Sequence, residues 1–233
     1  MTKLILSTSV FGDNPRYVVG IHRQYELAKY YFPNWEFRVY VDDRSKINID
    51  ATIIEIKDGS YGAFWRFLPL FEAADNIVVV RDADSRITPR EAMAIYQWIQ
   101  SGIRFHIIRD HPLHFRKPIL AGLFALRGKL DQSFHDAMLP YMTGAHSYGT
   151  DEEYLETVIY PHIRNDCLVH EINKGWFGLS KKFLKNPFEY CGNAFDQHDM
   201  PIYPVTDNPD DYPLRNLPTT ARFASYPYPW EDR

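Results

Sequence analysis

The sequence predicts an α/β fold in which one mixed, mostly parallel sheet is flanked by helices. Apolar, β-branched runs alternate along the chain with segments of helical periodicity, an order typical of layered α/β proteins. Helix starts at two places carry capping signals. The chain has 233 residues, of which 45% are hydrophobic, and this is enough for one sizeable core. We therefore expect a single domain over residues 1–233, with an irregular Pro-rich wrap at its C-terminal end.

The elements of the N-terminal part follow in order. The apolar run 3–9 predicts the first strand. Asn14 and Pro15 suit the N-cap and first position of a helix, which continues with apolar residues at helical spacing until Pro33 ends it. We then expect strands at 37–41 and 52–56, a short helix at 64–74, and a strand that starts at 77 and ends in an Asp-x-Asp sequence.

The second part is predicted in the same way. Thr88 and Glu91 have the spacing of a capping box around Pro89, so we expect a helix from 88 to 100 that Gly102 closes. A second capping box is expected at 150–153. The remaining predicted elements are strands at 104–109, 119–126 and 167–171 and a helix at 131–142.

Composition excludes several functional classes. The net charge of −4 and the pI of about 6.1 provide no basic surface, so we expect no nucleic-acid partner. No apolar run reaches 18 residues, and the N-terminal apolar stretch is too short for a signal peptide. Cys167 and Cys191, the only cysteines, are expected to be free thiols. We therefore expect a soluble, cytoplasmic protein with no membrane span.

Asp82 and Asp84 are the most informative pair of residues. They follow the apolar strand at positions i and i+2, and alternation along a strand points both carboxylates the same way. Two adjacent carboxylates repel unless a cation or a proton offsets their charge. Hard oxygen ligands suit Mg²⁺ or Mn²⁺, which are often shared with substrate phosphates. The alternative is that both residues end the strand and pair with Arg81 and Arg86.

Several motifs in the order found here resemble a known family. A helix at 65–70 that contains Arg66 precedes the Asp-x-Asp strand, the segment 151–155 reads Asp-Glu-Glu-Tyr-Leu, and the segment 168–170 reads Leu-Val-His. From residue 4 to about 176 the chain resembles nucleotide-sugar-dependent glycosyltransferases with the Rossmann-like GT-A fold and an Asp-x-Asp signature. The resemblance is to retaining, glycogenin-like transferases and to small soluble transferases of large algal viruses.

The resemblance implies a donor site. Asp82, Asp84 and His170 are expected to hold a divalent ion against the donor diphosphate, and their mixed oxygen and nitrogen set favours Mn²⁺, with Mg²⁺ as the other candidate. Arg66 and Lys174 are expected to add positive charge. The further donor-binding residues implied are Thr8, Asp13, Tyr17, Asp42 and Ala83. The alternatives are a surface pair of Arg66 with Glu72 or Asp75, a solvated Lys174, a buried, hydrogen-bonded His170, and ordinary turn or cap roles at the early strand ends.

Asp151 and Glu152 are the implied catalytic residues. In the family, a carboxylate or amide here lies beneath the reactive face of the sugar, which would let Glu152 act as nucleophile, charge stabiliser or hydrogen-bond acceptor. Family members often carry an amide at this position. The alternative is that carboxylates in the first turn of a helix only complement its dipole. The resemblance implies transfer with retention of anomeric configuration.

The acceptor side is predicted from the remaining polar and aromatic residues. His111, His114 and Trp176 are candidate acceptor contacts, with residues 1–110 forming the nucleotide-binding half and 111–233 the acceptor half and wrap. The function expected is transfer of a sugar from a nucleoside-diphosphate sugar, with a UDP-sugar as the expected donor, to a hydroxyl of a glycan or glycoconjugate. The alternatives are an aspartyl-phosphate-type phosphatase or phosphotransferase and a noncatalytic glycan-binding module.

Overall fold

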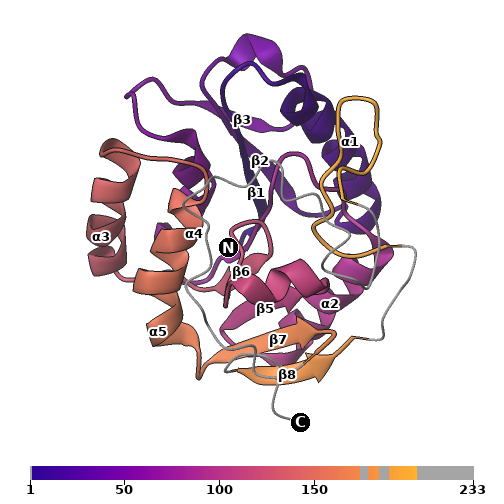
Figure 1. Cartoon of the computed structure of the whole chain (residues 1–233), viewed down its shortest axis with the longest axis vertical. Helices are drawn as coiled ribbons and strands as arrows, with labels where there is room; N and C mark the ends of the chain where they lie inside the picture. Colours follow the sequence, from indigo (N-terminus) through magenta and orange to yellow (C-terminus); the bar gives the residue numbers. More distant parts are fainter. Residues whose placement is uncertain (1, 174–177, 184–188, 204–233) are drawn as a thin grey trace.

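A computed structural model of the chain describes residues 2–173, 178–183 and 189–203. The described strands form one sheet in the order β3-β2-β1-β4-β6-β5-β7-β8 (Figure 1). All neighbours run parallel except β6, which is antiparallel to both β4 and β5. The predicted α/β fold with a mostly parallel sheet is thus confirmed. The strands are β1 (Leu4–Val10), β2 (Glu36–Val41), β3 (Thr52–Glu55), β4 (Ile77–Val80), β5 (Phe105–Arg109), β6 (Phe124–Arg127), β7 (Cys167–Glu171) and β8 (Leu179–Lys182).

Helices cover both faces of this sheet (Figure 1). On one face α1 and α2 pack over a core that includes Ile21 and Trp98. On the other, η2 and the α3–α5 segment pack over a core that includes Phe64 and Tyr154. The helical elements are α1 (Pro15–Tyr31), η1 (Arg44–Lys46), η2 (Gly62–Phe71), α2 (Pro89–Ser101), η3 (Pro112–Arg116), α3 (Gln132–Thr143), α4 (Thr150–Tyr154), η4 (Leu155–Ile159) and α5 (Tyr160–Ile163).

The two longest helices begin where their capping signals predict. The Asn14 side chain accepts a hydrogen bond from the Arg16 backbone N–H at 3.1 Å, and Pro15 is the first residue of α1. The Thr88 hydroxyl accepts one from the Glu91 backbone N–H at 3.2 Å, and Gly102 closes α2 with a φ of 74°. The Glu91 side chain does not complete the capping box, because its carboxylate forms a buried ion pair with Arg81, the residue that follows β4.

Three predicted boundaries are wrong. The Asp-x-Asp strand ends at Val80, so the two acids lie on a turn beyond it. The strand expected at 119–126 begins only at Phe124, which is the residue paired with Val80 in the antiparallel register. The second capping box does not form: Gly149, at φ 86°, is the N-cap, and the Thr150 hydroxyl bonds to backbone atoms of Ser147.

Two further elements differ from prediction. The helix expected at 64–74 is a 3-10 helix, η2, and the last described strand, β8, was not predicted. Much of the predicted C-terminal wrap lies outside the described residues. Within the described part, Ala194 forms a bridge with Ser85, and Phe195 forms one with Pro201.

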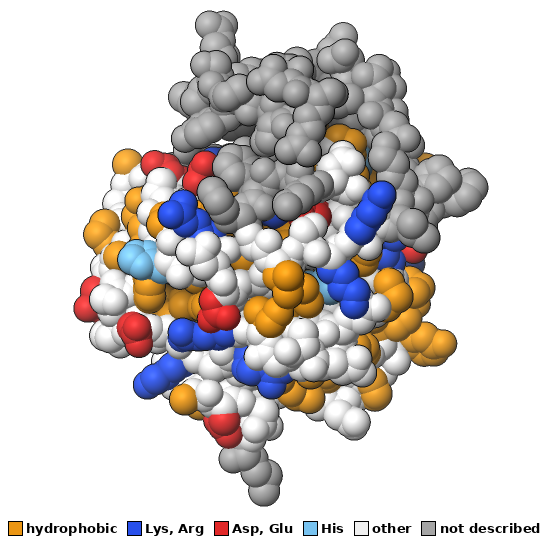
Figure 2. All heavy atoms as spheres, turned by 90° about the horizontal axis from the view of Figure 1, so that it is seen from below, with side chains coloured by type: hydrophobic (Ala, Val, Ile, Leu, Met, Phe, Trp, Pro, Cys, Tyr) orange, Lys and Arg blue, Asp and Glu red, His pale blue; other side chains and the backbone are white. Residues whose placement is uncertain are grey.

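Other expectations concern the molecule as a whole. Strand β5 belongs to the predicted nucleotide-binding half, but it lies between β6 and β7 of the predicted acceptor half. The sheet is therefore continuous across the two halves, and their separate roles stay a prediction. On the face shown in Figure 2, basic and acidic side chains occur in small groups among polar and apolar ones. None of the described helices is long and apolar enough to cross a membrane.

Candidate functional site

The candidate site lies where the strand order changes direction. From β1 the sheet continues to β2 on one side and to β4 on the other, and all three strands are parallel. Open α/β sheets bind ligands at the carboxyl ends of strands at such a switch point. Thr8 in β1, Asp42 after β2 and the turn 82–84 after β4 all belong to this edge of the sheet. The fold therefore gathers most of the predicted donor-binding segments.

The turn 82–84, which we call the acid turn, is held against α1 by Gln24. The Gln24 side chain is fully buried; its Nε2 donates to the backbone oxygen of Asp82, and its Oε1 accepts from Nε of Arg81 at 3.2 Å. Arg81 in turn forms a buried ion pair with Glu91 of α2. The backbone beneath the predicted metal ligands is thus attached to both helices on one face of the sheet.

Two glycines allow close packing around the acid turn. A Cβ at Gly20 of α1 would lie 2.2 Å from the backbone oxygen of Ala83, which is itself buried. A Cβ at Gly122 would lie 2.0 Å from Oδ2 of Asp82. Any side chain at either position would displace the turn or its carboxylate, so both glycines are required for this geometry.

Arg66 joins Asp82 to Asp151. Its Nη1 contacts Oδ1 of Asp82, and its Nη2 lies 2.5 Å from Oδ2 of Asp151. Burial alone would lower the pKa of Arg66, but the two carboxylates raise it above its ordinary value, so the side chain is cationic. The alternative partner Glu72 pairs instead with Arg38. The structure thus brings together three residues predicted for donor binding, metal binding and catalysis.

Asp84 lies close enough to Asp82 for their charges to interact. The Asp84 side chain is 9% exposed, and burial together with the Asp82 charge raises its pKa to about 6. Nε of Arg16 is 3.3 Å from Oδ2 of Asp84, and Nη2 of the same arginine donates to the Tyr17 hydroxyl at 2.6 Å. Tyr17, another predicted donor contact, is thereby connected to the acid turn.

Glu152 is half-buried beside the same charges. Burial and the carboxylates of Asp151 and Asp82 raise its pKa to about 8, although the N-terminus of α4 favours an ionised carboxylate. Glu152 is therefore protonated at neutral pH in this state. Unlike an exposed carboxylate that only complements a helix dipole, it is electrostatically part of the site.

The loops after β1 and β2 are connected to each other by polar contacts. Oδ2 of Asp42 accepts from the backbone N–H of Gly12 at 2.8 Å, and Nζ of Lys46 lies 3.1 Å from carboxylate oxygens of both Asp42 and Asp13. Thr8 is buried in β1, and its hydroxyl has no hydrogen-bond partner among the described residues.

His170 does not join the acid turn, which corrects the three-residue metal set expected from the sequence. Its Nδ1 lies 2.8 Å from Nε2 of His106, and its Nε2 lies 3.0 Å from Oε1 of Gln97. Burial lowers the pKa of His170 to about 4. No group of three His, Cys, Asp or Glu side chains in the described parts of the chain is arranged to hold a metal ion.

The predicted acceptor histidines are also interior. His111 and His114 are buried, and their Nδ1 atoms accept from the backbone N–H groups of Leu113 at 3.2 Å and Asp110 at 3.1 Å. Both rings pack against Tyr190. They therefore form part of the packing around η3 and do not line an open surface. Lys174 and Trp176 lie outside the described residues.

Sequence reasoning missed three residues of α1. Arg16, Gly20 and Gln24 contact the acid turn from one stripe of the helix, at i, i+4 and i+8. The available signal was a glycine and a glutamine within a helix whose neighbouring positions, such as Ile21, are apolar and core-facing. A small and a polar residue on a buried stripe indicate close backbone contact and a bonded amide.

Comparison with known proteins adds a likeness of fold. No protein-family model matches the chain, and no curated protein matches it. Among solved structures, the chain is similar to that titled "Crystal structure of a glycosyltransferase involved in the glycosylation of the major capsid of PBCV-1". The two are 13% identical, with a TM-score of 0.40, over 73% of this chain and 82% of that chain.

Proposed function

We propose that this chain is a glycosyltransferase that moves a sugar from a nucleoside-diphosphate sugar, UDP-based, to a hydroxyl of a glycan or glycoconjugate. The observation that carries the proposal is the contact of Arg66 with both Asp82 and Asp151. This contact joins segments far apart in the chain at the edge of the sheet where α/β folds bind ligands. The Arg66 guanidinium is a fixed cation beside these acids, and a leaving diphosphate needs positive charge nearby to stabilise it.

The arginines of the site suit a diphosphate. Arg66 and Arg16 each contact an acid-turn carboxylate, and a guanidinium can bind phosphate oxygens in the same two-pronged geometry. Nε of Arg66 and the Thr8 hydroxyl are buried without a hydrogen-bond partner among the described residues. Such groups are costly to leave unpaired and are available to a ligand. Asp42 and Tyr17 are the proposed contacts for the nucleoside.

Asp82 and Asp84 fit a divalent cation. Each would contribute carboxylate oxygen. Burial and then the Asp82 charge raise the Asp84 pKa, and the repulsion between the two acids favours a positive ion there. Mg²⁺ commonly binds through one or two carboxylates and completes its shell with substrate phosphates and water. The preference for Mn²⁺ depended on the His170 imidazole, so the carboxylate pair suits either ion. When bound, the ion would stabilise the charge of the leaving diphosphate.

The two carboxyl groups at the start of α4 are proposed to act on the sugar. Asp151 is buried against Arg66, and Glu152 carries a proton near neutral pH. Asp151 would then stabilise positive charge at the anomeric carbon while Glu152 hydrogen-bonds to the sugar or the acceptor hydroxyl. We propose retention of anomeric configuration. An NMR assignment of the product that shows inversion relative to the donor would contradict this part.

Thermal stabilisation by donors tests the proposal. We expect at least one nucleoside-diphosphate sugar from a panel of UDP-, GDP- and dTDP-linked sugars to raise the Tm when Mn²⁺ or Mg²⁺ is present. Asp84→Asn should keep the ordinary Tm and lose the metal-dependent increase, because the amide removes a charged ligand while preserving shape. Asp136→Asn, on the exposed side of α3, is the matched control and should behave as the wild type.

Product analysis separates the alternatives. Slow, metal-dependent release of nucleoside diphosphate from the stabilising donor supports a transferase. Release of phosphate from an aryl phosphate, with no donor binding, would indicate a phosphatase instead. Absence of both, with glycan binding retained, would indicate a noncatalytic module and refute the proposal.

A further inference from the structure

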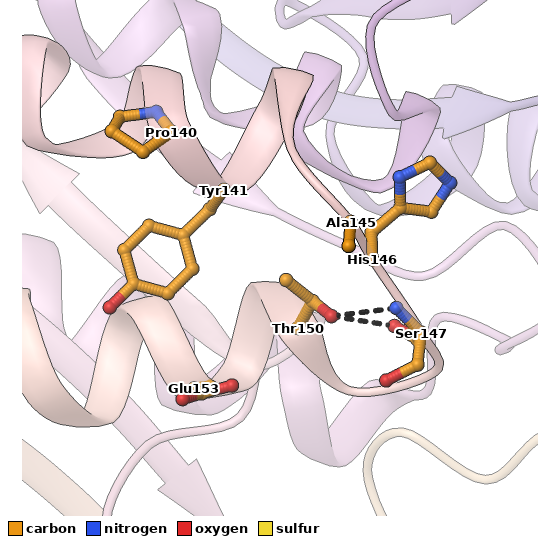
Figure 3. Close-up of a pocket in the computed structure, with 7 residues that line it drawn as sticks. All are labelled: Pro140, Tyr141, Ala145, His146, Ser147, Thr150 and Glu153. Carbon is orange, nitrogen blue, oxygen red and sulfur yellow. Dashed lines mark hydrogen bonds between the residues drawn. The ribbon is translucent and has the colours of Figure 1, made fainter.

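A groove lies between α3 and the start of α4 (Figure 3). It has a volume of about 460 Å³, within the range of about 300–1,000 Å³ for small-molecule sites. Figure 3 shows the Tyr141 ring directed from α3 toward α4, and the loop with His146 closing one end. The lining residues are Pro140, Tyr141, Ala145, His146, Ser147, Thr150 and Glu153.

The groove is bounded by side chains whose positions are fixed. The Tyr141 ring packs against Tyr154 in an edge-on contact at 5.6 Å, and its hydroxyl lies 3.3 Å from Oγ1 of Thr157. The Thr150 hydroxyl lies 2.9 Å from both the backbone nitrogen and the backbone oxygen of Ser147. Walls fixed before binding reduce the entropy that a ligand must overcome.

The groove adjoins the candidate active site. The His146 ring stacks on Tyr61 with centroids 4.0 Å apart and an interplanar angle of 13°. Burial and the charge of Asp151 raise the pKa of Tyr61, and the charge of Arg66 acts on it in the opposite direction. The Tyr61 hydroxyl therefore interacts electrostatically with both residues. Thr150, in the groove, directly precedes Asp151 in α4. The groove therefore adjoins the helix start that carries Asp151.

We infer that this groove binds one saccharide unit of an oligosaccharide acceptor. The inference rests on the proposed function, which it deepens. The flat Tyr141 ring can pack against the C–H face of a sugar, while Ser147, His146 and the exposed Glu153 can hydrogen-bond to its hydroxyls. Among the residues that the structure describes, the lining contains a carboxylate and no lysine or arginine, so it disfavours a nucleotide or another phosphate.

The unit bound here is not the one that reacts. Thr150 and Glu153 are three residues apart and share a helix face, whereas Asp151 lies about 100° around the helix from Thr150. A sugar in the groove is therefore turned away from the acid turn. The reacting hydroxyl must come from a neighbouring unit, so the site discriminates oligosaccharides from monosaccharides.

Saturation-transfer NMR without nucleotide or metal tests the inference. The probes are maltose, cellobiose, lactose and laminaribiose, with methyl α- and β-glucoside as single-unit references. We expect at least one disaccharide to bind, and Glu153→Ala and His146→Ala each to weaken that binding about tenfold, which corresponds to about 1.4 kcal/mol. Glu26→Ala, an exposed position on α1, is the control. His146→Phe preserves the stack on Tyr61 and shows whether the ring nitrogens matter.

The outcomes are independent of the donor experiment. Disaccharide binding that both groove variants weaken supports the inference even if no nucleotide sugar binds, in which case only the proposed function fails. Binding that neither variant weakens, binding that uridine diphosphate displaces, or no binding of any disaccharide overturns it. If transfer is measurable, groove variants should raise KM for the disaccharide and leave kcat, and KM for a methyl glycoside, unchanged.

Discussion

Arg66 faces more negative charge than it can offset. It contacts Asp82 and Asp151, while Asp84 and Glu152 lie near enough to interact electrostatically with Asp82. Burial and neighbouring carboxylates raise the pKa of Asp84 to about 6 and that of Glu152 to about 8. Arg66 acts to lower both pKa values, but burial and the charges of the neighbouring carboxylates outweigh it.

Removing Arg66 should destabilise the protein strongly. Arg66→Ala leaves Asp151 buried and unpaired, and loss of one partner from a buried pair costs about 3–5 kcal/mol. Urea unfolding monitored by tryptophan fluorescence measures the free energy of unfolding. Lys57→Ala, at an exposed position, should change it by less than about 0.5 kcal/mol. A loss below 1 kcal/mol for Arg66→Ala would mean that Asp151 finds another partner.

Glu152→Gln should stabilise the protein increasingly as pH rises above about 4.5, with the full gain reached above about pH 8. Glu152 has a pKa of about 8 in the folded protein against 4.5 ordinarily, so the folded state binds more protons between these values. Stability is therefore lost as pH rises through this range, and the amide removes that loss. The variant's Tm should match the wild type at pH 4 and exceed it at pH 9. Equal differences at both pH values would contradict the raised pKa.

At the scale of elements, α1 contributes to the site as a rigid support. The stripe formed by Arg16, Gly20 and Gln24 contacts the acid turn through an ion pair, a close backbone approach and a buried amide. Because these contacts come from one helix, a change at the middle of the stripe should affect the acids at its edge.

Gly20→Ala should destabilise despite the higher helix propensity of alanine. The propensity gain is about 1 kcal/mol, but the new Cβ would lie 2.2 Å from the Ala83 oxygen, and overpacking costs about 1–3 kcal/mol. We expect a lower Tm and weaker donor binding by calorimetry. Glu26→Ala, also in α1 but exposed, should leave both unchanged. A stabilised variant would show that α1 can move away from the turn.

The elements differ in how far the sequence could define them. Local signals defined α1 and α2, because Asn14 and Thr88 cap their own helices. The start of β6 could not be predicted locally, because it follows from the register of β6 with β4. The capping box at 150–153 failed for a local reason, since the Thr150 hydroxyl bonds to the Ser147 backbone. The sequence identified the residues of the acid turn but placed them at the end of a strand, because no local signal shows that strand pairing ends at Val80.

At the scale of the whole molecule, the face of each strand decided which predicted site residues meet. Arg66, Asp82, Asp151 and Glu152 lie close to one another, and their roles stay predictions. His170 was not correctly placed, because β7 is buried on both faces and its apolar sequence does not show alternation. Its side chain bonds to Gln97 of α2, on the face opposite α4. The order of motifs along the chain does not specify on which face of the sheet the His170 side chain lies.

The buried histidine pair should make the fold sensitive to acid. His170 has a pKa of about 4, below its ordinary 6.5, so the unfolded chain binds more protons between these values and stability falls as pH decreases from 6.5 to 4. The expected contribution is on the order of 3 kcal/mol. His170→Gln, which does not titrate, should reduce the difference in unfolding free energy between pH 7 and pH 4. An unchanged difference would contradict the prediction.

The shared amide of Gln24 has a mechanical consequence. One planar group is bonded at its nitrogen to the Asp82 carbonyl and at its oxygen to the Arg81 guanidinium. A rotation that improves one bond worsens the other, so the helix and the loop behind the acids must shift as a unit. We therefore expect a donor that presses on the first turn of α1 to reorient both carboxylates, so that nucleoside recognition and diphosphate capture become one event.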